Sequence, residues 1–102
     1  MDKIDRYITR GIQKMNQKNI LMYLMLWEIY DTMDISEKDY LQIFELKTEF
    51  SMKGIIQEVI HTQEQPEFRK TYRFYTERPV EEKIYIIREN DEYEIMLLTS
   101  EY

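Results

Sequence analysis

Eight consecutive apolar residues, from Ile20 to Trp27, limit the folds that are open to this chain of 102 residues. A membrane span needs about 20 such residues, so this run belongs in a core or at an interface. Asn19 precedes the run and is a suitable helix N-cap, and most residues of the run favour helices. The pattern therefore predicts one long helix from residue 19 to about residue 33.

The expected helix is apolar on nearly all sides. By the i, i+3, i+4 rule, one face holds Ile20, Tyr23, Leu24, Trp27, Tyr30 and Asp31, and the remainder holds Leu21, Met22, Met25, Leu26 and Ile29. A helix of this kind needs cover on more than one side. We expect Trp27 to be anchored between helix and sheet. We expect Met22, Met25 and Ile29 to face a long loop, the N-terminal segment or, by self-association, a second copy.

After Asp39 the spacing of apolar residues changes from a helical period to the period of two that is typical of strands. Strands are predicted at residues 39–47, 55–63, 68–76, 83–88 and 93–99. An earlier strand is predicted at residues 6–12, where Gly11 marks a bulge or a close backbone approach. Residues 13–18 are predicted to be a loop, and residues 89–92 a hairpin turn.

Short connections make consecutive strands antiparallel neighbours. The predicted fold class is therefore α+β with two layers, in which one main helix packs on a mostly antiparallel five- to six-stranded sheet. The expected order is strand-helix-strand-strand-strand-strand-strand. The length fits a single domain that spans residues 1–102.

Composition argues against several classes of protein. The chain has no cysteine, which rules out a disulfide scaffold and zinc sites built on thiolates. Its formal net charge of −6 disfavours direct nucleic-acid binding, because phosphate backbones repel an acidic surface. The polar start of the sequence lacks the apolar core of a signal peptide, and no run is long enough for a membrane span, so a cytoplasmic location is expected.

Segments scattered over nearly the whole chain carry a family resemblance. They are residues 6–11, Leu26-Trp27, residues 39–46, residues 60–67, Tyr72-Arg73-Phe74, and the stretch from Met96 to Tyr102. These segments resemble the family known as domain of unknown function 960, which occurs in low-GC Gram-positive bacteria and their phages. The resemblance implies membership over the whole domain and a bacterial cytoplasmic or phage-borne setting. It implies no particular activity.

No set of residues has the spacing of a catalytic or metal site. His61 is the only histidine, and Glu58 and Glu64 lie three residues away on either side, on the opposite face of a strand. Glu45 and Glu58 can face each other on adjacent strands, but nearby lysines favour a salt-bridge ladder. We therefore expect no enzymatic activity, metal or cofactor. The alternative is an enzyme or small-ligand-binding protein whose site has no recognisable motif.

The function that remains is protein binding. Residues 28–67 hold ten acidic and three basic side chains, and the chain has nine tyrosines, more than so small a domain can bury. We expect a partner-binding surface formed by Glu28, Asp31, Asp34, Glu37, Asp39, Asp91, Glu92, Tyr93 and Glu94. Its partner would be a protein with a basic surface.

The narrowest form of this hypothesis is an acidic phage or mobile-element effector that inhibits a host nucleic-acid-binding complex, as anti-CRISPR proteins do. Other interpretations stay open. Arg69 and Arg73 share a strand face with Thr71 and Tyr75, which is typical of nucleic-acid platforms, although the net charge opposes it. The chain can also be a structural subunit of a larger assembly, with its acids serving solubility alone.

Overall fold

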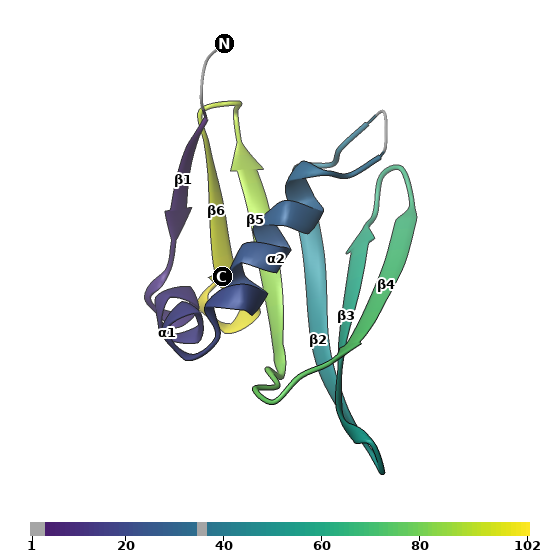
Figure 1. The fold of residues 1–102 in the computed structure, drawn as a ribbon. Coiled ribbons are helices and arrows are strands. Elements are labelled where there is room, and N and C mark those ends of the chain that lie inside the picture. Colours follow the sequence, from purple (N-terminus) through teal and green to yellow (C-terminus); the bar gives the residue numbers. More distant parts are fainter. Residues whose placement is uncertain (1–3, 35–36) are drawn as a thin grey trace.

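A computed structural model describes residues 4–34 and 37–102 and contains two α-helices and one six-stranded sheet (Figure 1). The elements are β1 (Asp5–Ile8), α1 (Arg10–Lys18), α2 (Ile20–Asp31), β2 (Leu41–Ser51), β3 (Gly54–Gln63), β4 (Phe68–Tyr75), β5 (Glu82–Glu89), β6 (Tyr93–Leu98) and the short 3-10 helix η1 (Thr99–Glu101). The α+β class is confirmed. The expected single main helix is wrong, because two helices follow β1.

The segment that differs from the sequence prediction is the end of the first strand. β1 stops at Ile8, and the residues expected as strand end and loop form α1. The Thr9 side chain caps this helix by accepting from the Ile12 N–H, and Ile12 and Met15 fill the core from its inner face. Gly11 is the site of a close backbone approach, as predicted, but it lies in a helix rather than a strand. A Cβ at this position would lie 2.6 Å from Leu98 Cδ1. Ile12 and Met15 lie three residues apart in an otherwise polar segment, and this spacing was the sequence signal for the short helix.

Helix α2 begins and ends close to its predicted bounds. The Asn19 side chain accepts a hydrogen bond from the Met22 N–H at 3.0 Å, which confirms Asn19 as the N-cap. The buried residues of α2 are Met22, Leu26, Trp27, Ile29 and Tyr30. Trp27 is confirmed as a core residue, whereas Ile20 and Leu24, which were assigned to the same face, are exposed.

The face expected to remain for self-association is therefore not a free surface. Met22 and Ile29 are buried in the core and Met25 packs against it. The helix is rotated relative to the predicted orientation. The sheet covers its inner side, and α1 covers one of its flanks. Self-association itself stays a prediction, but Met22 and Ile29 do not provide its contact surface.

The sheet has the strand order β1-β6-β5-β2-β3-β4. The expectation that consecutive strands are antiparallel neighbours is wrong at two places. β5 does not pair with β4 but returns to the free edge of β2, and β1 pairs with β6 in parallel. The other pairs are antiparallel. The returning segment 76–81 is fixed by Gln57, whose side chain accepts from the Val80 N–H at 2.8 Å and donates to the Val80 carbonyl at 2.9 Å.

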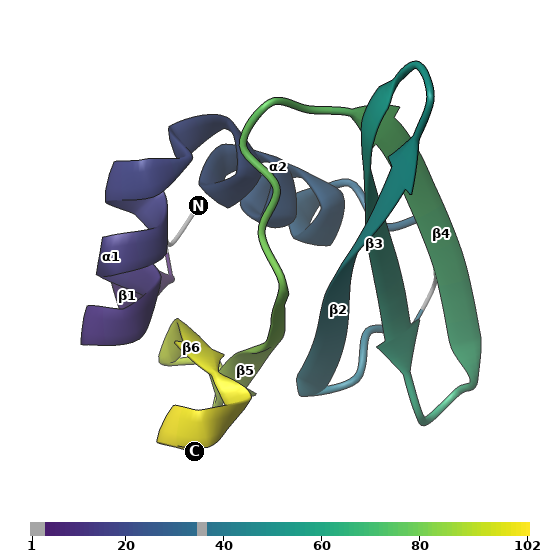
Figure 2. The same cartoon turned by 90° about the horizontal axis from the view of Figure 1, so that it is seen from below.

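Both helices lie on the same side of a curved sheet (Figure 2). We call this side the covered face. Its core cluster joins Trp27, Leu26 and Ile12 of the helices to Phe44, Leu46, Val59, Ile84, Ile86 and Met96 of the strands. Alternation along each strand places the next residues on the other side, which we call the open face.

Candidate functional site

The structure brings most of the predicted acidic residues to one end of the molecule. The turn after α2 and the β5–β6 hairpin both lie at the end that is uppermost in Figure 1, and Asp34, Glu37, Asp91 and Glu92 are exposed there. Glu28 is exposed on α2. Asp39 serves the fold instead, because its carboxylate accepts from the N–H groups of Tyr40 and Gln65.

Glu94 is not an exposed partner-binding residue, and its assignment is corrected. It is only 4% exposed, because it lies on the covered face of β6 opposite Arg88. Its carboxylate accepts from the Tyr30 hydroxyl and from Arg6 Nε, the latter at 3.1 Å. A period-two count from Met96, which is in the core, would have predicted this inward direction.

Arg6 connects β1 to α2 through a second carboxylate. Its guanidinium donates to Asp31 through both terminal nitrogens and lies 4.3 Å from the centre of the Trp27 ring. The hydrogen bond to Asp31 raises the pKa of Arg6 above its usual value. Asp31 is therefore paired within the chain rather than available as a free charge, which reduces the acidic surface that the sequence predicts.

The charged side chains at this end border a cavity of about 480 Å³. Lys38 donates to the Tyr30 carbonyl at 2.8 Å, and its ammonium lies 4.0 Å from the Tyr30 ring centre. Burial lowers the pKa of Lys38 and, together with the bond to Glu94, raises that of Tyr30. Because these charged and polar side chains are already paired with one another, they hold β1, α2 and β6 together.

His61 is part of a second buried polar group. Its ring stacks on Phe44 with 4.3 Å between centroids, and its Nε2 lies 2.7 Å from Gln42 Oε1. The Gln42 amide in turn donates to Gln63 at 2.7 Å. Burial lowers the pKa of His61 to about 4. The arrangement is that of a structural histidine. The described residues contain no group of three or more His, Cys, Asp or Glu side chains placed to hold a metal ion.

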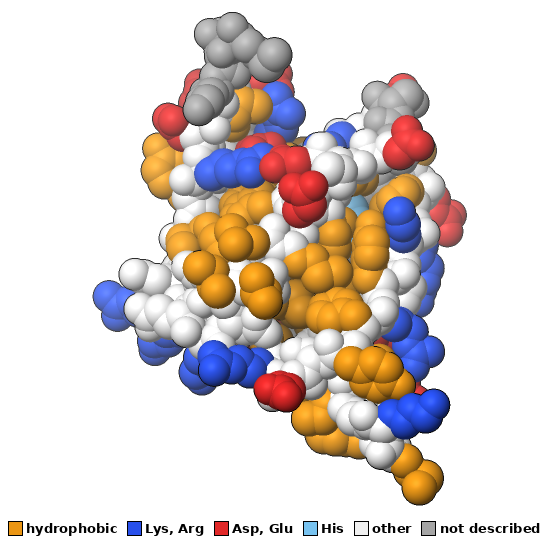
Figure 3. All heavy atoms as spheres, in the orientation of Figure 1, with side chains coloured by type: hydrophobic (Ala, Val, Ile, Leu, Met, Phe, Trp, Pro, Cys, Tyr) orange, Lys and Arg blue, Asp and Glu red, His pale blue; other side chains and the backbone are white. Residues whose placement is uncertain are grey.

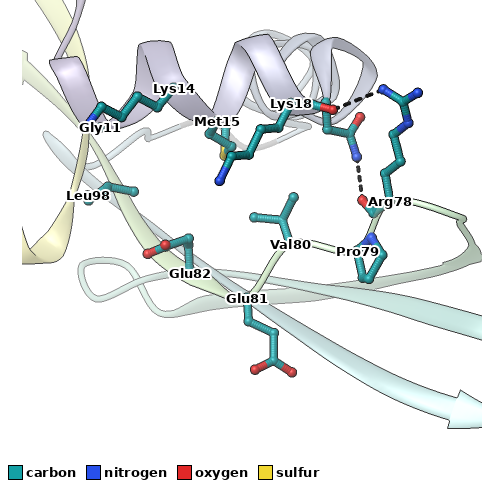
Figure 4. Close-up of a pocket in the computed structure, with 11 residues that line it drawn as sticks. Gly11, Lys14, Met15, Lys18, Arg78, Pro79, Val80, Glu81, Glu82 and Leu98 are labelled. Atoms are coloured by element: carbon teal, nitrogen blue, oxygen red, sulfur yellow. Dashed lines mark hydrogen bonds between the residues drawn. The ribbon is translucent and has the colours of Figure 1, made fainter.

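A cavity of about 450 Å³ lies between α1 and the segment that leads into β5 (Figure 4). Met15, Val80 and Leu98 form its apolar floor, and Lys14 and Lys18 of α1 stand across from Glu82. Two of its polar side chains are already bonded: Asn19 donates to the Arg78 carbonyl and Arg78 donates to the Lys18 carbonyl. These bonds hold the returning segment in place. No histidine or serine is among the eleven lining residues.

The feature that sequence reasoning missed is the composition of the open face. Nine of its aromatic and aliphatic side chains form a set that crosses five neighbouring strands. We call this set the open-face band: Tyr7, Leu41, Ile43, Ile60, Tyr85, Ile87, Tyr93, Ile95 and Leu97. Cross-strand register makes the set continuous, since Tyr7, Ile95, Ile87 and Leu41 form one row and Leu97, Tyr85 and Ile43 form the next. The two helices lie on the opposite side, as Figure 2 shows.

Exposure of the open-face band varies across the sheet. Ile60, Ile87 and Leu97 are buried, although none belongs to the core cluster, and Tyr7 is 52% exposed. Tyr7 contacts Tyr93, and Tyr85 contacts Tyr102, in both cases edge to face with 5.6 Å between ring centroids. Among the other tyrosines, Tyr30 is buried and Tyr40 is exposed.

Charged residues surround the open-face band unevenly. At the hairpin end, Asp5 and Glu89 flank Tyr93, next to the exposed Asp91 and Glu92. At the other end, Lys47 pairs with Glu45, and Arg73 pairs with Glu49 and Glu58. One rim is therefore acidic and the other is nearly balanced.

Fold and surface together define a class: a small two-layer α+β domain with one sheet face left open. The chain belongs to the family described as "Staphylococcal protein of unknown function (DUF960)", whose model matches residues 5–101, so the resemblance of its segments is confirmed. The crystal structure of a protein of unknown function from Enterococcus faecalis has the same fold, with a TM-score of 0.72 and 17% identity. The match covers 100% of this chain and 98% of that one. Curated proteins include no match.

No helix within residues 4–34 and 37–102 is long and apolar enough to cross a membrane.

Proposed function

We propose that this chain is a non-enzymatic protein-binding module of the bacterial cytoplasm, and that the open-face band is its interface. One observation supports the proposal. Apolar side chains form continuous rows across the sheet face that the helices leave uncovered. An antiparallel sheet with one solvated face normally carries polar side chains on that face. A partly exposed apolar surface rimmed by polar residues is typical of a protein-binding site.

The residue types of the band match those of protein interfaces. Tyrosine is enriched at interfaces because it adds contact area at a low cost in side-chain entropy. Four tyrosines lie in or beside the band. They form two contacting pairs, and the two rings of each pair restrict each other's motion. Alternation directs roughly half of the strand residues to the open face. The open face as a whole therefore has about as many residues as one side of a standard interface, which has 20–30.

The rim supports a partner with a basic surface. Asp5, Glu89, Asp91 and Glu92 border the band at the hairpin end, and Arg88 is the partner of only one of them, Asp91. Such rim charges mainly accelerate association, while the apolar centre sets the rate of dissociation. The narrower proposal, an acidic effector that inhibits a host nucleic-acid-binding complex, rests on this rim and on the exposed Asp34 and Glu37.

The test is affinity capture from staphylococcal lysate with matched variants of the bait. Tyr85→Ala with Ile95→Ala removes apolar contacts of the band without adding charge. Ile20→Ala with Leu24→Ala is the control, because both side chains are exposed on α2. We expect a specific partner to be lost with the band variant and kept with the control. A partner that follows the opposite pattern would place the interface on α2 and contradict the proposal.

A further inference from the structure

A different surface lies at the β4 edge of the sheet, away from β1. Among the strands of residues 4–34 and 37–102, β4 pairs with β3 alone, so its outer backbone groups have no partner strand there. The Thr76 N–H donates to the Ile55 carbonyl at 2.9 Å, which fixes the phase of this ladder. By alternation, the N–H and C=O groups of Arg69, Thr71, Arg73 and Tyr75 point outward. An open edge of this kind is a template for another strand.

The covered face beside β4 is only partly filled. Phe68, Tyr72 and Phe74 point toward the helix layer but stay half-buried. Phe74 and the α2 residues Leu21 and Met25 line a cavity of about 180 Å³. Figure 3 shows apolar side chains on α2 and over β3–β4, with a hollow between them. A strand added to β4 would place alternate side chains beside the half-buried Tyr72 and Phe74.

Charge identifies the kind of strand that fits. β4 carries Arg69, Lys70 and Arg73 and no acidic residue, although the chain as a whole is acidic. Arg73 is neutralised by Glu49, whereas Arg69 and Lys70 form no ion pair with any described residue. Like charges opposite one another destabilise a strand pair. The two cations therefore favour an acidic strand over a basic one.

We propose that β4 accepts an extended segment of a partner protein as a further antiparallel strand, with apolar residues opposite Phe74 and Tyr72 and acidic residues opposite Lys70 and Arg69. Read from its N-terminus, the segment has the pattern apolar, any residue, apolar, polar, acidic, acidic. The two apolar side chains pack against Phe74 and Tyr72 on the covered face. The acids pair with one cation on each face of the sheet. This contact is independent of the open-face band.

The probe is an acetylated, amidated ten-residue peptide with the core Val-Thr-Val-Thr-Glu-Glu between serine-glycine ends. We expect it to slow hydrogen exchange at the N–H groups of Thr71, Arg73 and Tyr75 by at least about tenfold at saturation, because these groups gain acceptors. The amides of Tyr72 and Phe74, which already point to β3, serve as internal controls. The same peptide with N-methyl groups on its pairing edge should give no protection.

Charge reversal tests the specificity. Arg69→Glu with Lys70→Glu should weaken binding of the acidic peptide by about tenfold or more and allow binding of a Lys-Lys analogue. Lys14→Glu with Lys18→Glu, which changes exposed cations of α1, should leave both affinities unchanged. A folded Thr71→Pro protein should lose binding, since proline removes an outward N–H that an edge strand can spare.

Three outcomes would overturn the proposal. Unchanged exchange at Thr71, Arg73 and Tyr75 would mean that no strand is added. Equal binding of acidic and basic peptides would remove the charge argument. Protection of the same amides by oligo-dT, but not by the peptide, would assign the edge to single-stranded nucleic acid. None of these results depends on the open-face band, so the proposed function is tested separately.

Discussion

The two faces of the sheet carry the same kinds of residue and have different fates. On β5, Ile84 and Ile86 are fully buried in the core cluster under the helices, whereas on the open face Tyr85 is half-buried against Tyr102 and Ile87 is buried outside the core cluster. Apolar composition alone therefore does not say which face of this sheet is the core. The difference lies in what covers each face: helices of this chain on one side, and on the other, under our proposal, a partner.

This comparison leads to a ranking of mutational effects. Side chains under the helices should govern folding, and side chains of the open-face band should govern binding. A substitution on the covered face leaves a cavity that the surrounding core fills poorly, whereas one on the open face leaves a gap that water enters. The predictions below run from the largest expected change to the smallest.

Trp27→Ala should lower the free energy of unfolding by about 3–5 kcal/mol, because the indole is buried between α2 and the sheet and supports both Arg6 and Tyr30. Urea denaturation followed by circular dichroism measures the change. Leu24→Ala, an exposed position one turn away, is the control and should cost well under half as much. An unchanged midpoint for Trp27→Ala would mean that the indole lies at the surface.

Ile86→Ala and Ile95→Ala compare the two faces directly with the same chemical change. Ile86 is 0% exposed in the core, so its truncation should cost about 2–4 kcal/mol. Ile95 is half-buried on the open face, and its truncation should cost roughly 1 kcal/mol. Differential scanning calorimetry on both variants gives the ratio. Equal losses would show that the open face is packed as a core in the isolated chain, and the proposed interface would fail.

His61 should make stability depend on pH. Its pKa is about 4 in the folded chain against an ordinary 6.5, so the unfolded chain binds the proton more readily. Its contribution is fully present above pH 6.5 and is lost as the pH falls toward 4, on the order of 2–3 kcal/mol in total. In His61→Gln, which keeps a donor toward Gln42, this part of the pH dependence should be absent. An identical pH profile for both proteins would mean that His61 is solvated.

The amount that sequence could predict follows from the period of each segment. β3 and β4 alternate clearly and their bounds were nearly right, as was the Asn19 cap. The sequence Ile84-Tyr85-Ile86-Ile87 is apolar on both faces, so periodicity could not reveal which face was open. The return of β5 to β2 also had no local signal, because Gln57 recognises the backbone of Val80 across 23 residues.

The candidate site was predicted in part, for the same physical reason. Asp34, Glu37, Asp91 and Glu92 are exposed, as expected of acids in turns. Glu94 was assigned to the surface because it is charged, yet Arg6 and Tyr30 provide the partners that let a carboxylate be buried. These partners are 88 and 64 residues away, so no local pattern could indicate them.

The smallest change in stability should come from the acidic rim, with a separate effect on kinetics. Asp91→Asn with Glu92→Gln keeps the shape of the hairpin, and asparagine tolerates the positive φ of 58° at position 91. Both side chains are exposed, so the stability should change by less than about 0.5 kcal/mol. Association with the captured partner should slow severalfold at low salt, and the difference should vanish near 1 M salt, where the Debye length is about 3 Å. Tyr93→Ala, in contrast, should accelerate dissociation at every salt concentration, because that ring packs on Tyr7 within the open-face band. Surface plasmon resonance separates the two rates. If the rim variant changes dissociation and Tyr93→Ala changes nothing, the acids contact the partner directly and the open-face band is not the interface.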